Sequence, residues 1–151
     1  PTNLRLEITE SAFVLDVKKQ MELVHNLQAY GFIIEIDDFG SGYSTLNSLK
    51  DIMVDVLKMD LKFFEKSDNR ERARKIVHSV ISLANELDMP VIAEGVESLE
   101  DVKMLKAAGC QMIQGYFFAK PMSVSDYEVF VDEYACSEMK QIIDDLNKLE
   151  K

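Results

Sequence analysis

The stretch IIEIDDFGSG, residues 33–42, places two adjacent aspartates directly after a run that reads as a buried β-strand. Two neighbouring carboxylates repel each other, and a charge at the end of an apolar strand needs a compensating partner. The glycine-rich residues that follow mark the start of a loop. The pair Asp37 and Asp38 therefore predicts that something cationic is held at the end of this strand.

Strand-like and helix-like segments alternate along the rest of the chain. Apolar runs predict five strands, at 4–9, 32–39, 54–60, 90–96 and 110–118. Apolar residues at helical spacing predict helices at 11–30, 69–89 and 98–109 and a helical remainder from about residue 123. Asn69 or Asp68 and Ser98 are the expected helix N-caps. This order is typical of a parallel sheet with helical crossovers, so the predicted fold class is α/β.

Composition narrows the class of protein. The 151 residues suit one domain, and 47% hydrophobic with 29% charged residues suits a packed globular core. A net charge of −10 disfavours DNA as a partner and suits a site for divalent cations. Cys110 and Cys136 are too few for a disulfide framework and fit a reducing compartment. No apolar run approaches the roughly 20 residues that cross a bilayer, and we expect a cytoplasmic domain, whose parent protein could be anchored to a membrane through further N-terminal regions.

Polar side chains collect at the C-terminal ends of the five predicted strands. In chain order they are Glu7, Asp37, Asp38, Lys58, Asp60, Glu94 and Gln114. The ends of parallel strands meet at one rim, where sheet and barrel enzymes hold their catalytic groups. Carboxylates without His or Cys among them predict Mg²⁺, Mn²⁺ or Ca²⁺ rather than zinc. Two such ions about 3.5–4 Å apart would serve attack on a phosphodiester, with Lys58 orienting the water or steadying the phosphate charge.

Five motifs in this order resemble the EAL-domain cyclic di-GMP phosphodiesterases: LEITES, IDDFGSGYSTL, VDVLKMD, VIAEGVES and IQGYFFAKP, within residues 4–121. The resemblance implies a modified (β/α)₈ TIM-type barrel whose first strand runs opposite to the others. It implies hydrolysis of cyclic di-GMP to linear pGpG with two Mg²⁺ or Mn²⁺ ions, in bacterial second-messenger signalling.

The resemblance also assigns roles to single residues. It places the metal ligands at Glu7, Asp37, Asp38, Asp60 and Glu94. It places catalytic groups at Lys58, Glu94 and Glu97, and substrate-binding groups at Gln114 and Pro121. Glu10 would hold in place the loop DDFGSGYST, which in the family links the metal site to the dimer interface.

The sequence lacks the Glu-Ala-Leu signature of the family and the asparagine of the family's third strand. The glutamate of that signature and this asparagine are both metal ligands in the family. Because such a barrel takes about 250 residues, we expect the chain to correspond to the last five βα units, without the first three strands. The expected division is 1–122 as the C-terminal portion of an EAL domain and 123–151 as a helical segment that closes or extends it. We expect an upstream sensory or diguanylate-cyclase-like domain, a homodimer, and weak activity of this chain alone.

Two other interpretations stay open at this point. An EAL-like module could bind cyclic di-GMP as a receptor without cleaving it, although every motif position that is present is of the active type. An unrelated barrel enzyme could use Mg²⁺ on a phosphorylated or enolisable substrate, which Lys58 and Asp60 would permit, but the five-motif match argues against it.

Overall fold

The computed structural model describes residues 3–13, 16–40, 52–62, 69–134, 140–142 and 144–145. Its centre is a five-stranded sheet in the order β1-β2-β3-β4-β5 in which every neighbouring pair is parallel. The strands are β1 (Arg5–Thr9), β2 (Ile33–Asp37), β3 (Val56–Asp60), β4 (Val91–Glu94) and β5 (Met112–Ile113). The predicted parallel α/β sheet is thereby confirmed.

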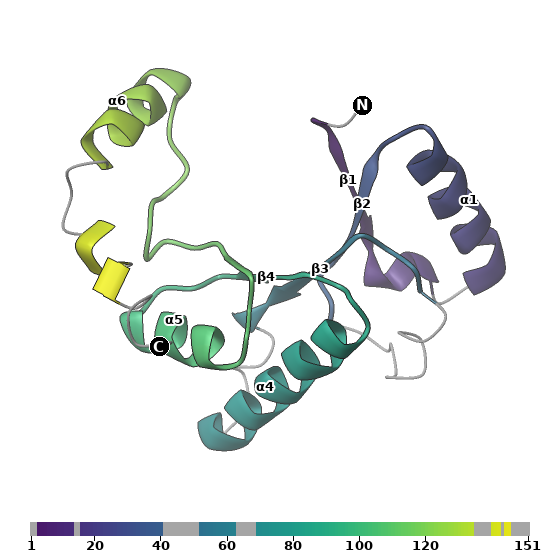
Figure 1. Ribbon diagram of the computed structural model, residues 1–151, viewed down its shortest axis with the longest axis horizontal. Coiled ribbons are helices and arrows are strands. Elements are labelled where there is room, and N and C mark those ends of the chain that lie inside the picture. Colours follow the sequence, from purple (N-terminus) through teal and green to yellow (C-terminus); the bar gives the residue numbers. More distant parts are fainter. Residues whose placement is uncertain are drawn as a thin grey trace.

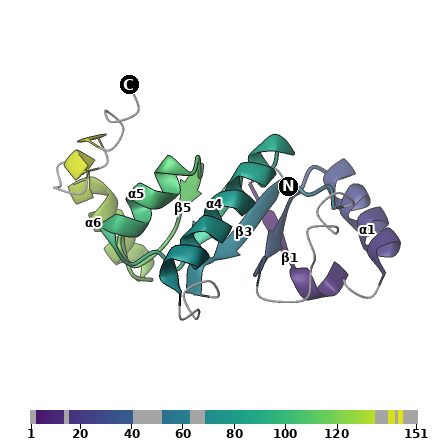
Figure 2. The same cartoon turned by 90° about the horizontal axis from the view of Figure 1, so that it is seen from below.

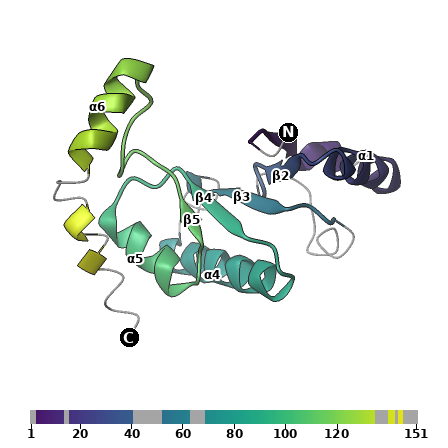
Figure 3. The same ribbon diagram turned by 45° about the horizontal axis from the view of Figure 1, so that its top comes forward.

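Helices cross over between the strands and lie along the outer side of the curved sheet (Figure 1). They are α1 (Val17–Ala29), α4 (Arg70–Glu86) and α5 (Leu99–Ala107), with a 3₁₀ turn, η1 (Glu10–Phe13), after β1. The last described long helix, α6 (Val124–Tyr134), stands apart from α4 and α5 in two views (Figures 1 and 3). None of the described helices is long and apolar enough to cross a membrane.

Local capping sets the helix starts. Asn69 accepts a hydrogen bond from the amide of Arg72 at the start of α4, and Ser98 accepts one from Asp101 at the start of α5, as predicted. The helix expected over 11–30 is divided instead. A 3₁₀ turn occupies residues 10–13, and Asp16 caps a new helix by accepting a hydrogen bond from Lys19.

The core lies between the sheet and the helices on its outer side (Figure 2). Alternate strand residues that are fully buried point to this side: Ile34, Ile36, Leu57, Met59, Val91 and Ala93. They belong to one cluster with Val24 of α1, Ile81 of α4 and Leu105 of α5. Burying each of the larger side chains among these contributes roughly 1.5–3 kcal/mol, so this face contributes strongly to the stability of the sheet.

The other strand residues share the opposite face, because side chains alternate along a strand. Register places Glu7 beside Glu35, Glu35 beside Val56, and Asp60 beside Glu94. Val56 and Ile92 on this face are also buried, but they are not part of the outer core cluster. We call this the inner face of the sheet, and it carries the polar residues singled out in the sequence.

The C-terminal part differs from the expectation. The strand predicted over 110–118 is reduced to β5, Met112–Ile113, because Gly115 and the turn after it replace further ladder pairing. There Gln114 O accepts a hydrogen bond from Val96 N, and Phe117 N donates one to Val96 O. α6 is helical as predicted but contains no buried residue.

Candidate active site

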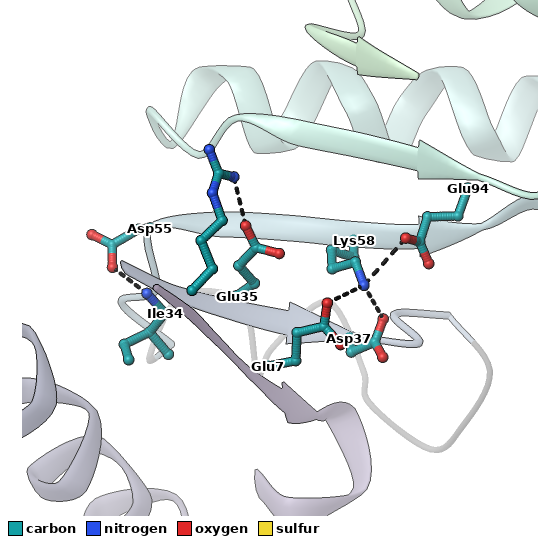
Figure 4. A network of polar contacts seen from close by, with 8 residues as sticks. Glu7, Ile34, Glu35, Asp37, Asp55, Lys58 and Glu94 are labelled. Carbon is teal, nitrogen blue, oxygen red and sulfur yellow. Dashed lines mark hydrogen bonds and ion pairs between the residues drawn. The ribbon is translucent and has the colours of Figure 1, made fainter. Parts of the chain in front are cut away.

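Lys58 lies at the centre of three carboxylates that reach it from three other strands (Figure 4). Its Nζ donates a hydrogen bond of 2.6 Å to Glu7 Oε1. It forms ion pairs with Asp37 Oδ1 and Glu94 Oε1, each at 3.2 Å. The Lys58 side chain is only 8% exposed. β1, β2 and β4 thus each direct one acid at a cation carried by β3, and we call these four residues the Lys58 cluster.

The cluster contains more negative than positive charge. Burial by itself would lower the pKa of Lys58, but the hydrogen bonds to Glu7 and Glu94 and the neighbouring charges outweigh it and raise the pKa above its usual value. Burial raises the pKa of Glu94, the charges of Asp37 and Glu7 add to this rise, and Lys58 opposes it. One ammonium therefore does not fully offset three carboxylates, and a further cation would be stabilised here.

One oxygen of the cluster also fits a metal ion. Asp37 Oδ1 is buried and makes no hydrogen bond within the described residues, although Lys58 Nζ lies 3.2 Å away. The described residues hold no group of three or more acidic, His or Cys side chains already arranged around a metal position. Instead, the Lys58 ammonium occupies the point where the carboxylates converge. A donor set made only of carboxylates suits Mg²⁺, Mn²⁺ or Ca²⁺.

The two remaining predicted metal ligands, Asp38 and Asp60, flank the cluster. Asp38 follows Asp37 in a left-handed conformation with φ 58°, which Asp adopts more readily than most residues. Asp60 lies beside Glu94 in register, and its Oδ1 accepts a hydrogen bond of 2.8 Å from Lys62 N. A Cβ at Gly95 would lie 3.0 Å from that oxygen, so a glycine leaves room for the Asp60 carboxylate.

Glu10 and Glu97, two further acids of the predicted site, lie in different parts of the molecule. Glu10 is 2% exposed, and its Oε2 accepts a hydrogen bond of 2.8 Å from Gly40 N, just after the paired aspartates. The rest of the predicted GSGYST loop lies outside the described residues. Glu97 is not brought to Lys58. It lines a hollow of about 340 Å³ between the N-terminal ends of α4 and α5, together with Arg70 and Arg74.

Gln114 and Pro121 line one pocket of about 460 Å³ at the C-terminal end of the sheet. Gln114 follows β5 and continues the inner face two residues after Met112. Tyr116, Lys120 and Tyr127 line the same pocket. The Lys120 ammonium lies 5.7 Å from the centre of the Tyr116 ring, so the pocket offers an aromatic surface next to a positive charge.

Sequence reasoning missed an ion pair below the cluster. Arg5 Nη1 lies 2.6 Å from Glu35 Oε1, and the Glu35 side chain is 3% exposed. Each residue precedes a predicted metal ligand by two positions, Glu7 and Asp37 respectively, and so shares its face. This two-residue spacing along each strand could have indicated that Arg5 and Glu35 belong to the site. Tyr116 was also missed, and its position directly after Gln114 and Gly115 was the signal there.

Comparison with known proteins identifies the family. The EAL domain family model matches residues 1–121. The cyclic di-GMP phosphodiesterase NbdA of Pseudomonas aeruginosa is 34% identical over 131 residues, which cover 87% of this chain and 17% of that protein. The chain thus spans about a sixth of the length of this relative.

Solved structures agree with this result. The c-di-GMP complex of the phosphodiesterase PaMucR matches with a TM-score of 0.76 and 34% identity, over 84% of this chain and 51% of that chain. The manganese and c-di-GMP complex of Klebsiella pneumoniae BlrP1 matches with a TM-score of 0.69 and 32% identity, over 78% of this chain and 30% of that chain. The fold is that of EAL domains, which are barrels of the TIM type, and the chain belongs to the EAL domain family.

Proposed function

We propose that this chain contributes the metal-dependent active site of a cyclic di-GMP phosphodiesterase that yields linear pGpG. The observation that carries the proposal is the Lys58 cluster, in which acids from three strands converge on a buried ammonium. The names of similar proteins support it, since NbdA is a cyclic di-GMP phosphodiesterase and BlrP1 has been solved with manganese and c-di-GMP.

Glu7, Asp37, Asp38, Asp60 and Glu94 would hold two Mg²⁺ or Mn²⁺ ions, which when bound lower the pKa of a water and neutralise charge on the phosphodiester. Lys58 acts at the same point. Its ammonium already donates a hydrogen bond of 2.6 Å to Glu7, and at this point it would donate to an attacking water or to the phosphate. It can thus orient an attacking water or stabilise the phosphate oxygens as negative charge develops.

Glu94 and the pocket would serve different steps. Glu94 lies beside Asp60 in register and 3.2 Å from the Lys58 ammonium, so as a metal ligand it would also contact the attacking water. Gln114 and Pro121 would contact the substrate within the pocket next to Tyr116. Glu10 would fix the loop at Gly40 through its 2.8 Å hydrogen bond. Glu97, in its separate hollow, would support the segment after β4 and not the reacting atoms.

The proposal extends to the whole protein. We propose that residues 1–122 are a C-terminal portion of an EAL domain, that residues 123–151 extend it, and that an upstream sensory or cyclase-like domain precedes it. The match covers only 17% of NbdA, which supports the presence of further domains in the whole protein. A homodimer and a cytoplasmic location of the domain are part of the same proposal.

The test is the conversion of cyclic di-GMP to pGpG, followed by chromatography with excess Mn²⁺ and, separately, with EDTA. It is made on the protein with its complete EAL domain and on this chain alone. We expect Mn²⁺-dependent cleavage by the complete domain, weak cleavage by this chain, and a loss of roughly 10²–10⁴-fold in Glu94→Gln. The control Glu22→Gln removes an exposed carboxylate from the outer helix α1 and leaves turnover unchanged.

Cleavage that persists in EDTA would contradict the metal-dependent site. Tight binding of cyclic di-GMP by the complete domain without formation of pGpG would contradict the enzyme and would indicate a receptor.

A further inference from the structure

The ion pair between Arg5 and Glu35 lies on the inner face, one layer below the Lys58 cluster. Arg5 Nη1 and Glu35 Oε1 are 2.6 Å apart, with the Arg5 side chain 48% exposed and that of Glu35 3% exposed. Glu35 stands beside Glu7 in the β1–β2 register and two residues before Asp37. The pair therefore borders two members of the Lys58 cluster directly.

Stability alone does not explain this pair. A buried ion pair gains little over well-packed apolar residues of similar size, because desolvation of the two charges offsets their attraction. The neighbour of Glu35 on β3 is Val56, which is 5% exposed, so an apolar side chain would suit this position. The charge at Glu35 is more readily understood through the charges beside it.

Two carboxylates and two cations alternate here. Glu7 and Glu35 are partners in the register of two adjacent strands, whose backbones are spaced about 4.8 Å apart. Like charges on side chains so close to each other are destabilising. Lys58 follows Val56, the partner of Glu35, by two residues on the same face. Without Arg5, Glu35 would be a fourth carboxylate beside the Lys58 ammonium. Without Glu35, Arg5 would be free to pair with Glu7 on its own strand.

We infer that Arg5 and Glu35 are positioning residues: by pairing with each other, they leave Lys58 to Glu7, Asp37 and Glu94. In the structure Arg5 pairs with Glu35 and Lys58 pairs most closely with Glu7, each with a nitrogen–oxygen distance of 2.6 Å. The geometric part of this inference stands on the side chains alone. Its consequence for cation binding rests on the proposed function.

A cycle of three variants tests the pairing: Arg5→Gln, Glu35→Gln and the double variant. In the metal-free chain we expect Arg5→Gln to move Lys58 Nζ toward Glu35 and to lengthen its 2.6 Å contact with Glu7. We expect the double variant, which leaves neither charge, to restore that contact. The readout is a crystal structure or NMR contacts of the Lys58 side chain in solution.

Binding of Mn²⁺ to a complete EAL domain that carries these variants, measured by calorimetry, gives the second readout. Mutation of residues that orient the ligands of a metal typically changes its affinity by about 10–100-fold, and we expect the Mn²⁺ affinity to change about tenfold in each single variant. The double variant recovers to within about threefold, and Arg5→Lys, which keeps the charge, retains most of the affinity. Lys75→Gln is the matched control, because it removes an exposed 2.8 Å ion pair with Glu71 on the outer helix α4.

The outcomes separate this inference from the proposed function. A Lys58–Glu7 contact that is unchanged in Arg5→Gln, or a double variant as impaired as the worse single one, overturns the inference. A double variant that recovers while the single ones do not supports it, since a merely structural loss would add up. Absence of Mn²⁺ binding by a complete EAL domain that contains the unmodified chain contradicts the proposed function, and the position of Lys58 still decides the inference.

Discussion

The two faces of the central sheet are built from the same strands and do different work. On the outer face Leu57 and Met59 are fully buried among the helices. On the inner face the residue between them, Lys58, is surrounded by carboxylates. The alternation of side chains along a strand lets one short segment supply both packing and chemistry. Changes on one face should therefore affect stability, and changes on the other should affect binding and turnover.

The largest effect is expected from Lys58→Met, which keeps the length of the side chain and removes its charge. In a complete EAL domain it should lower kcat about 10³-fold, equivalent to about 4 kcal/mol, with little change in KM, because the group acts mainly in the transition state. Steady-state kinetics on cyclic di-GMP measure this. A change confined to KM would mean that Lys58 only binds substrate.

The neighbouring substitution Met59→Ala should do the opposite. Met59 is 0% exposed in the outer core, and its truncation leaves a cavity that costs about 3 kcal/mol of unfolding free energy. The affinity of the folded chain for Mn²⁺ should stay unchanged. Urea unfolding and calorimetry on the same sample measure both. A loss of Mn²⁺ affinity as large as that of an inner-face variant would show that the two faces are not separable.

A smaller effect is expected from Gly95→Ala, with Gly109→Ala as its control. Both glycines have a positive φ, 75° and 81°, so an alanine costs about 1–2 kcal/mol at either position. The added Cβ would lie 3.0 Å from Asp60 Oδ1 at Gly95 and 3.1 Å from Asn85 Nδ2 at Gly109. Only Gly95→Ala should also weaken Mn²⁺ binding. An equal affinity of both variants for Mn²⁺ would contradict the assignment of Asp60 as a metal ligand.

The sheet and its polar rim could be predicted from the sequence because their signals are local. Apolar runs mark the strands, and the acids at the strand ends mark the rim on which Glu7, Asp37 and Glu94 meet Lys58. The N-caps Asn69 and Ser98 were predictable for the same reason, since each acts within three residues.

Features that depend on distant partners could not be predicted. The pairing of Arg5 with Glu35 depends on the β1–β2 register, which joins residues 30 positions apart in the sequence. The shortening of β5 depends on close approach of Gly115 to Val96, where a Cβ would lie 2.0 Å from the carbonyl oxygen. The position of Glu97 in a hollow with Arg70 and Arg74 depends on how the N-terminal ends of α4 and α5 pack against each other.

The most direct test of the account is whether the inner face binds a divalent cation through the Asp37 carboxylate, whose Oδ1 is buried. Titration of Mn²⁺ into a complete EAL domain that contains the unmodified chain, Asp37→Asn or the control Glu22→Gln measures it, with thermal unfolding to verify that all three are folded. We predict that Asp37→Asn weakens Mn²⁺ binding by at least about tenfold while Glu22→Gln binds like the unmodified chain. Equal affinity in Asp37→Asn and the unmodified chain would contradict the assignment of the inner face as the metal site.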